Sequence, residues 1–139
     1  RTPAALDAPI PAANGTFTAR SITRLAAALA GGGVIDGVRV LSATTLARAT
    51  EIQHDRVDLV VGFPMLWRLG YHVAYTTAGG ILPGAFGHTG FGGSGAWADP
   101  ERDLAMCFIP SALGTGLAMD LRFLKLGGRA VRAVDARDG

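Results

Sequence analysis

One segment of the chain concentrates residues that could do chemistry, and it runs from Phe86 to Glu101 with the sequence FGHTGFGGSGAWADPE. His88 can carry a proton or donate a hydrogen bond near neutral pH, because the ordinary pKa of imidazole is about 6.5. Four glycines between Gly90 and Gly95 would let a ligand or another segment approach the backbone closely. We therefore expect a bare strand edge beside His88.

Other kinds of site fit the residues poorly. The glycines at 90–95 match neither phosphate-binding loop, since they have no lysine and another strand is expected after them. Ser94 narrowly misses the Gly-x-Ser-x-Gly nucleophile elbow, so a structural role is expected for it. His54 lies beside Asp55 but lacks further ligands at suitable spacing, so no metal site is predicted.

Two further residues with reactive side chains are expected to be structural. His72 lies on a predicted strand, where a surface or cross-strand position is favoured over a ligand. Cys107 lies between Met106 and Phe108, so we expect a small core residue rather than a reactive thiol. As the single cysteine, it also excludes an internal disulfide.

The composition limits the class of protein. The chain has 139 residues, which corresponds to one domain or part of one. Apolar residues make up 49% and charged residues 17%, which favours a folded core over disorder. A net charge of +2 makes nucleic acid an unfavourable partner. No membrane span or signal peptide is recognised, which leaves the compartment open and slightly favours the cytoplasm.

Helical and turn signals dominate residues 1–60. Three prolines predict an extended arm over 1–16, and Thr18 followed by apolar residues at helical spacing predicts a helix over about 18–30. An Asp-Gly pair predicts a hairpin at Val34–Arg39. Ser42 then starts a short helix over about 43–51.

Strand signals dominate residues 61–139. Strands are expected at Leu66–Ala74, Ala85–His88, Ser94–Ala98 and Leu104–Ile109, with turns at Gly79-Gly80 and Pro83-Gly84 and antiparallel pairing of the last two strands. A final helix is predicted over 116–134, with Gly127-Gly128 as a kink or break. The fold class is therefore α/β in the α+β sense, with both regions forming one partial domain of a larger fold.

The segment Phe86–Ser94, followed by Ala98-Asp-Pro-Glu101, resembles the serine hydrolases of the β-lactamase and penicillin-binding-protein superfamily. Within it, the chain is similar to class C β-lactamase-like esterases, the family VIII carboxylesterases. These enzymes carry Ser-x-x-Lys, Tyr-x-Asn or Ser-x-Asn, and Lys-Thr-Gly motifs. His-Thr-Gly commonly replaces the third motif in esterase-like members. Residues 18–33, 36–42 and 67–71 resemble further parts of the family, in the expected order.

The resemblance covers only the C-terminal portion of such an enzyme. None of the four serines, Ser21, Ser42, Ser94 and Ser111, is followed three positions later by lysine. The only asparagine, Asn14, has alanine two positions before it. Since the first two motifs are absent, we expect the chain alone to be inactive.

The resemblance also implies roles for the third motif. The backbone N–H of Phe91 would form an oxyanion hole with the N–H of the missing nucleophile, and His88 would project into the cleft, which makes both catalytic candidates. Thr89 would orient the substrate, and Gly90 would keep the strand accessible. No cofactor is implied. A neutral histidine in place of lysine attracts the carboxylate of a β-lactam less, which favours an uncharged ester.

The expected partners are a small-molecule ester or β-lactam-like substrate and the missing N-terminal segment of the same enzyme. An uncovered sheet would also leave room for a homo-oligomer. The alternative hypothesis is a non-catalytic binding or dimerising module derived from the same fold.

Overall fold

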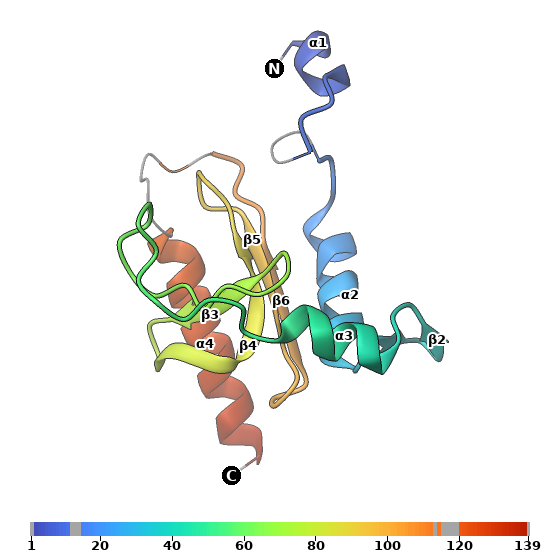
Figure 1. Ribbon diagram of the computed structural model, residues 1–139, viewed down its shortest axis with the longest axis vertical. Helices are drawn as coiled ribbons and strands as arrows, with labels where there is room; N and C mark the ends of the chain where they lie inside the picture. Colours follow the sequence, from blue (N-terminus) through green and yellow to red (C-terminus); the bar gives the residue numbers. More distant parts are fainter. Residues whose placement is uncertain (1, 12–14, 113, 115–119, 139) are drawn as a thin grey trace.

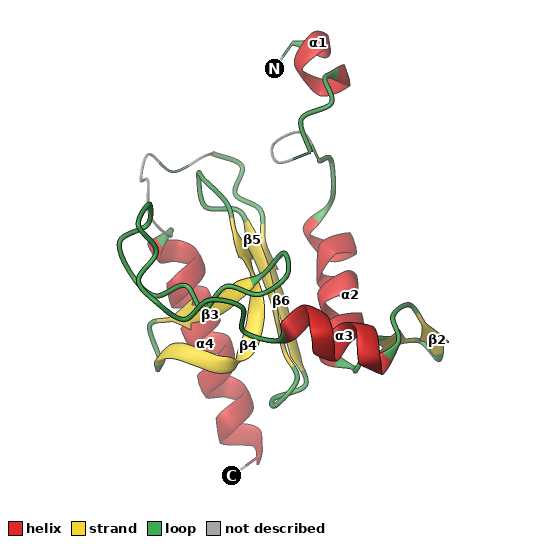
Figure 2. Cartoon of the chain, viewed as in Figure 1, coloured by secondary structure: helices red, strands yellow, loops and turns green. Residues whose placement is uncertain are grey.

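A four-stranded antiparallel sheet lies between two helices in the computed structural model, which describes residues 2–11, 15–112, 114 and 120–138 (Figure 1, Figure 2). Each strand pairs with its neighbour in the chain. In their order across the sheet, the strands are His72–Thr76 (β3), Gly80–Thr89 (β4), Gly95–Asp99 (β5) and Leu104–Phe108 (β6). The two helices are Ala19–Ala30 (α2) and Leu121–Asp138 (α4). This confirms the predicted mixture of helices and antiparallel strands.

Two helices that precede the sheet, α2 and α3 (Ala43–Thr50), begin directly after capping residues. Thr18 accepts a hydrogen bond from the Ser21 N–H at 3.1 Å and starts α2, and Ser42 accepts one from Thr45 at 3.0 Å and starts α3. Both predicted helices are confirmed.

The prediction of an extended arm over 1–16 is wrong at Pro3–Asp7, which forms the short helix α1. Proline suits the first turn of a helix, because its missing N–H would have no intrahelical partner there. In Figure 1, α1 lies at the end of a segment that leads away from the sheet.

The hairpin predicted at Val34–Arg39 is confirmed. Strands β1 (Val34–Ile35) and β2 (Val38–Arg39) pair antiparallel. The two turn residues have positive φ angles, 50° at Asp36 and 76° at Gly37. Positive φ at both positions is what a two-residue turn of this twist requires.

The first strand of the sheet is displaced from its predicted position at 66–74. Leu66 and Gly70 have φ angles of 46° and 83°, which a regular strand does not accommodate. Trp67 instead forms an isolated bridge with His54. The strand therefore begins only at His72.

Strand β4 is longer than predicted, since it contains the Pro83-Gly84 pair that was expected to form a turn. The pairing of β3 with β4 shifts between Val73, opposite Phe86, and Ala74, opposite Leu82, so the intervening residues of β4 bulge from the ladder. Proline fits such a bulge, because it has no N–H to contribute to the ladder.

The C-terminal helix α4 runs from Leu121 through Gly127 and Gly128 to Asp138, so the expected kink or break is wrong. The first four residues of the predicted helix, 116–119, lie outside the described residues. A Cβ at Gly128 would lie 2.9 Å from the Ala78 backbone nitrogen. The glycines thus permit close packing of the helix on the sheet, and this packing outweighs their poor helix propensity.

Two apolar clusters cover the two faces of the sheet. On the α4 side the buried residues include Trp97, Phe123 and Val131. On the α2 side Ala26 and Leu29 pack against Phe86 and Ala98. Residues from the first 60 positions therefore share a core with the strands.

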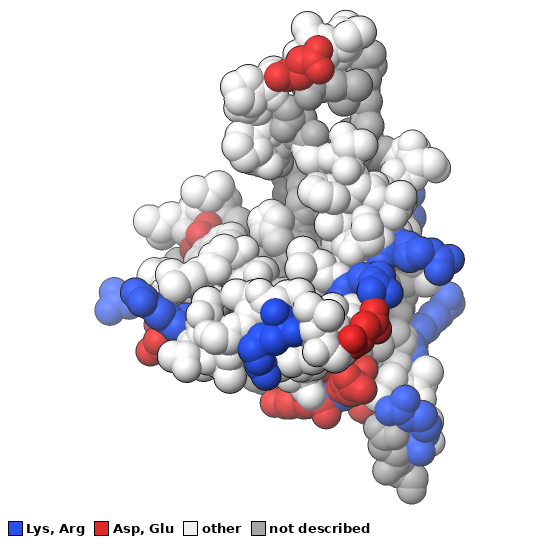
Figure 3. Space-filling view, turned by 90° about the vertical axis from the view of Figure 1, so that its right-hand side faces the viewer, with Lys and Arg blue, Asp and Glu red and all other residues white. Residues whose placement is uncertain are grey.

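Basic and acidic side chains are interspersed on the surface. Figure 3 turns the α2 and α3 side toward the viewer, and blue and red side chains lie next to one another at several places there. Arg24 of α2 forms an ion pair with Asp36 in the hairpin turn. Among the described residues, no helix is both long enough and apolar enough to span a bilayer.

Candidate active site

The predicted catalytic segment lies at the end of β4, where His88 and Thr89 are the last strand residues. Strand β3 pairs with β4 only as far as His72, opposite Gly87, whereas β5 pairs as far as Gly95, opposite Thr89. Among the described strands, the end of β4 thus has a neighbour on one side only. His88 lies where the bare edge begins.

A tight turn connects β4 to β5 and sets the position of Phe91. The Gly90 N–H donates to the Ser94 carbonyl oxygen at 2.7 Å, and the Gly93 N–H donates to the Gly90 carbonyl oxygen at 3.1 Å. A Cβ at Gly93 would lie 2.3 Å from a carboxylate oxygen of Asp120. Glycine at position 93 therefore allows the turn to pack against the residue that precedes α4.

Phe91 is at the exposed corner of this turn, with 73% of its surface accessible. Within the described residues, no acceptor is found for its backbone N–H. A backbone donor at an exposed strand end can serve a ligand. The position is therefore compatible with the donor role that the sequence predicts for Phe91.

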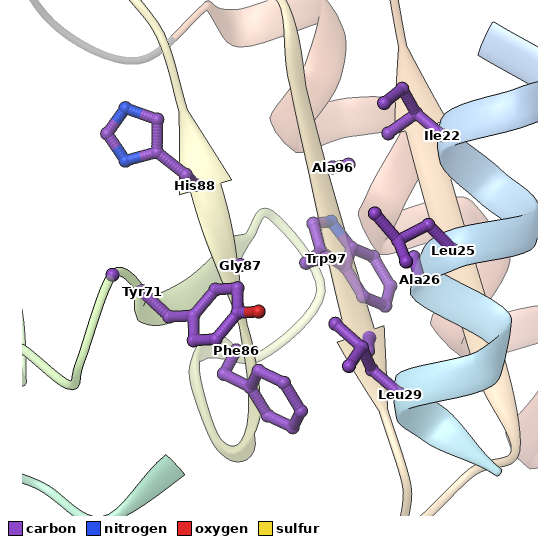
Figure 4. Close-up of a pocket in the computed structure, with 12 residues that line it drawn as sticks. Ile22, Leu25, Ala26, Leu29, Tyr71, Phe86, Gly87, His88, Ala96 and Trp97 are labelled. Atoms are coloured by element: carbon purple, nitrogen blue, oxygen red, sulfur yellow. The ribbon is translucent and has the colours of Figure 1, made fainter. Parts of the chain in front are cut away.

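His88 is exposed and contacts a second imidazole. The centroids of the His88 and His72 rings lie 5.2 Å apart, with an angle of 64° between the planes. In Figure 4 the ring of His88 points away from α2. An exposed imidazole in this place can donate a hydrogen bond to a ligand or exchange a proton with it.

His72 occupies the cross-strand position that the sequence allows, but it is buried rather than at the surface, with 2% of its area exposed. Its Nε2 accepts a hydrogen bond from the Thr89 N–H at 3.0 Å, and its Nδ1 lies 2.7 Å from the Val73 carbonyl oxygen. Since Nε2 is an acceptor, the ring proton is on Nδ1. Burial lowers the pKa of His72, the hydrogen bond to Val73 opposes this, and the charges of His88 and Arg68 lower the pKa further.

Arg68 supports the bulge in β4, a role that the sequence analysis missed. Its guanidinium donates to the carbonyl oxygens of Pro83 at 2.7 Å and Ala85 at 3.2 Å, and to that of Thr50 at 2.8 Å. The side chain is buried, which lowers the pKa of Arg68, although a guanidinium remains charged. Arg68 thereby links the bulge to the end of α3 and stabilises the part of β4 that precedes His88.

A cavity of about 190 Å³ lies between α2 and strands β4 and β5 (Figure 4). Leu25 and Leu29 line it from α2, Phe86 and Tyr71 line it from the opposite side, and His88 lies at its rim. The lining is mostly apolar. The cavity therefore suits an apolar group, with His88 beside it.

The remaining reactive residues have other surroundings. The Ser21 hydroxyl accepts a hydrogen bond from the Thr18 N–H at 3.2 Å in the capping box of α2, and the Ser42 hydroxyl caps α3. The Ser94 carbonyl oxygen accepts the Gly90 N–H in the turn before β5. Cys107 is half-buried, and burial raises the pKa of its thiol, which disfavours the reactive thiolate. His54 is joined to Trp67 by backbone hydrogen bonds. In the part of the chain that the structure describes, no group of three or more His, Cys, Asp or Glu residues could hold a metal ion.

Sequence comparison gives one family and one curated relative. Residues 1–126 match the family model described as Beta-lactamase. The chain is 43% identical over 118 residues to the esterase/beta-lactamase LipL of Mycobacterium tuberculosis, and the match covers 82% of this chain and 26% of the relative. The chain thus spans about a quarter of the length of this relative.

Comparison with solved structures finds proteins of similar kinds. A family VIII carboxylesterase matches with a TM-score of 0.70 and 34% identity, over 81% of this chain and 30% of that chain. A penicillin-binding protein homologue from Caulobacter crescentus matches with a TM-score of 0.70 and 31% identity, over 84% and 32%. A beta-lactamase from Mycobacterium bovis matches with a TM-score of 0.56 and 26% identity, over 78% and 41%.

Proposed function

The chain belongs to the beta-lactamase family, and on this basis we propose that it is the C-terminal portion of a serine hydrolase that cleaves carboxylic esters. The observation that carries the proposal is the position of the His88-Thr89-Gly90 motif at a strand end with one bare edge, followed directly by the exposed residue Phe91, whose backbone N–H has no acceptor among the described residues. This arrangement fits one wall of a site for acyl transfer.

The Phe91 N–H would stabilise the oxyanion. Attack of a serine oxygen on an ester carbonyl moves negative charge onto the carbonyl oxygen, and a fixed N–H donor lowers the energy of that state more than that of the substrate. The turn held by the hydrogen bonds of Gly90 and Gly93 keeps this donor in place before substrate arrives. The second donor would be the N–H of the nucleophile itself.

The nucleophile would come from a segment that this chain does not contain. No serine of the chain is followed three positions later by lysine. The hydroxyl groups of two of the four serines are engaged at helix starts, since Ser21 accepts from the Thr18 N–H and Ser42 from the Thr45 N–H. The proposed activity therefore belongs to a longer protein, to which this chain contributes the oxyanion donor and the substrate-contacting edge.

His88 favours an ester over a β-lactam in this proposal. A lysine at this place would attract a substrate carboxylate by its full charge, whereas a neutral imidazole offers a hydrogen bond only. Thr89 and Gly90 would contact the substrate along the bare edge. The proposed substrate is thus an uncharged carboxylic ester with an apolar group that suits the nearby surface.

The test is a comparison of substrates in the complete protein whose reading frame contains this chain. Hydrolysis of p-nitrophenyl esters and of a chromogenic cephalosporin would be measured together with labelling by a serine-reactive phosphonate. We expect ester turnover, at most weak β-lactam turnover, and a labelled serine outside the present sequence. The 139-residue chain alone, measured in parallel, should neither turn over esters nor become labelled.

Three outcomes would contradict the proposal. Labelling of one of the four serines of this chain would place the nucleophile within it. A clear preference for the cephalosporin would replace the ester as substrate. Absence of both turnover and labelling in the complete protein would favour a non-catalytic binding or dimerising module with the same fold.

A further inference from the structure

His72 is the only histidine among the described residues whose side chain is buried, and both of its ring nitrogens have backbone partners. Nδ1 lies 2.7 Å from the Val73 carbonyl oxygen, and Nε2 accepts from the Thr89 N–H at 3.0 Å. This pair of bonds fixes the tautomer with the proton on Nδ1. A neutral ring with a defined tautomer is a specific requirement, and a buried aromatic ring without nitrogens would not meet it.

The hydrogen bond from Thr89 to His72 replaces one that the sheet lacks at this position. Strand β3 begins at His72 opposite Gly87, so no residue of β3 stands opposite Thr89. The backbone of β4 would lack a hydrogen-bond partner on this side from Thr89 onward. The imidazole of His72 supplies an acceptor to the Thr89 N–H at the place where a longer β3 would otherwise supply a carbonyl oxygen.

A further group holds the His72 ring in position. The ring of Trp67 contacts that of His72 edge to face at 5.5 Å, and the Trp67 Nε1–H donates to Asp58 at 2.8 Å. The His72 ring also contacts the ring of His88, and the two ring centroids lie 5.2 Å apart. A chain of contacts thus runs from Asp58 through Trp67 and His72 to the motif.

We propose that His72 is a positioning residue for the site at the end of β4, where its imidazole fixes the backbone at Thr89 and the ring of His88. The proposal rests on the proposed function, because it gives the fixed strand end a catalytic purpose. His72 itself touches no substrate. It acts through Thr89 and through the turn that carries the Phe91 N–H two residues later.

The first test reads the hydrogen bond directly and needs no substrate. In the 15N-labelled 139-residue chain, and in the complete protein, NMR at pH 7.5 would report the protonation of each ring nitrogen of His72. We expect an unprotonated Nε2 and a protonated Nδ1, together with slow solvent exchange of the Thr89 amide. A proton on Nε2, or exchange at Thr89 as fast as at an exposed loop amide, would overturn the proposal whatever the activity.

The second test uses ester kinetics in the complete protein. His72→Phe keeps a ring but removes both nitrogens, and we expect kcat to fall about tenfold or more while KM changes less than threefold. His72→Gln offers an amide oxygen to the Thr89 N–H and should recover part of kcat. His54→Gln is the matched control, since His54 is exposed and outside the site, and it should keep the wild-type kcat.

The two tests separate the possible failures. An unchanged kcat in His72→Phe would overturn the positioning role even if the hydrogen bond is present. If His72→Phe does not fold, His72→Leu, which also lacks an acceptor for the Thr89 N–H, takes its place in the comparison with His54→Gln, and equal kcat values would overturn the role. If the wild-type complete protein hydrolyses no ester, the proposed function fails and the catalytic role of His72 fails with it, while the NMR result still establishes or refutes the hydrogen bond.

Discussion

Gly87 and Trp97 face each other across β4 and β5 so closely that position 87 has no room for a side chain. A Cβ at Gly87 would lie 2.5 Å from the Cα of Trp97 and 2.0 Å from the carbonyl oxygen of Ala96. Both of these atoms belong to the backbone, which cannot move without disturbing the ladder. The absence of a side chain immediately before His88 is therefore a packing requirement.

Replacing Gly87 with alanine should destabilise the fold. Overpacking of this kind costs about 1–3 kcal/mol in the free energy of unfolding, and the contact with backbone atoms places this site at the upper end. Urea denaturation followed by tryptophan fluorescence would measure the loss. Gly79→Ala is the control, because a Cβ there meets nothing within 4 Å, and it should change stability by less than 1 kcal/mol. Equal stability of the two variants would contradict the close approach seen at Gly87.

Substitution of Arg68 should destabilise the fold more than substitution of an exposed polar residue. Arg68→Met keeps much of the side-chain volume but leaves the carbonyl groups of Pro83 and Ala85 without their donor, so we expect a loss of about 2–4 kcal/mol in the free energy of unfolding. The midpoint of urea denaturation would report it. Arg56→Met, at an exposed arginine, should change stability by less than 0.5 kcal/mol. A similar small change in Arg68→Met would show that the guanidinium does not support the bulge.

The sequence predicted those elements that local signals specify. Thr18, Ser42 and the Asp36-Gly37 pair set helix starts and a turn by interactions within a few residues, and all three predictions are confirmed. The errors arise where distant residues decide. The bulge in β4 depends on Arg68, and the unbroken helix α4 depends on how Gly128 packs against the chain at Ala78.

The oxyanion role proposed for Phe91 depends on its backbone and can be tested by proline substitution. Phe91→Pro removes the N–H, whereas Phe91→Ala removes only the exposed ring. In the complete protein, we expect kcat for ester hydrolysis to be about 100-fold or more lower in Phe91→Pro than in Phe91→Ala, as for loss of one oxyanion donor. Circular dichroism would check that both variants fold. A ratio near one would exclude the Phe91 N–H as a donor.

The buried His72 should make stability depend on pH. Its pKa lies below the ordinary value because the folded state disfavours the charged ring, so the unfolded chain binds the proton first as pH falls below about 6.5. The free energy of unfolding should therefore decrease from pH 7 to pH 5, by at most about 1.4 kcal/mol per pH unit. Urea denaturation at several pH values would measure this slope.

A variant without this imidazole identifies the source of the slope. His72→Gln should flatten the dependence between pH 7 and pH 5, whereas His54→Gln should retain it. The carboxyl groups of Asp58 and Asp120 act in a separate, more acidic range, since hydrogen bonds hold the pKa of each below the ordinary value of an aspartate. An equal slope in both variants would assign the titration to another group.

Prediction of the site from sequence had the same limit as prediction of the fold. The motif at His88 was visible because its residues are adjacent in the chain. His72 precedes Thr89 by 17 positions, and its contact depends on where β3 begins, which the irregular backbone at Leu66 and Gly70 determines. No local pattern shows this, although a histidine on a strand next to the motif strand could have been considered as a partner for its end.

The order of the strands has a consequence for the folding kinetics. Each strand pairs only with strands that directly precede or follow it in the chain, so the whole sheet consists of successive hairpins that close short loops at a small entropic cost. Helix α2 must instead reach β5 and β6 across more than 60 residues. We expect amides of the hairpins to become protected before those of α2 in pulse-labelled hydrogen exchange during refolding, so that the sheet is the template on which the helices assemble.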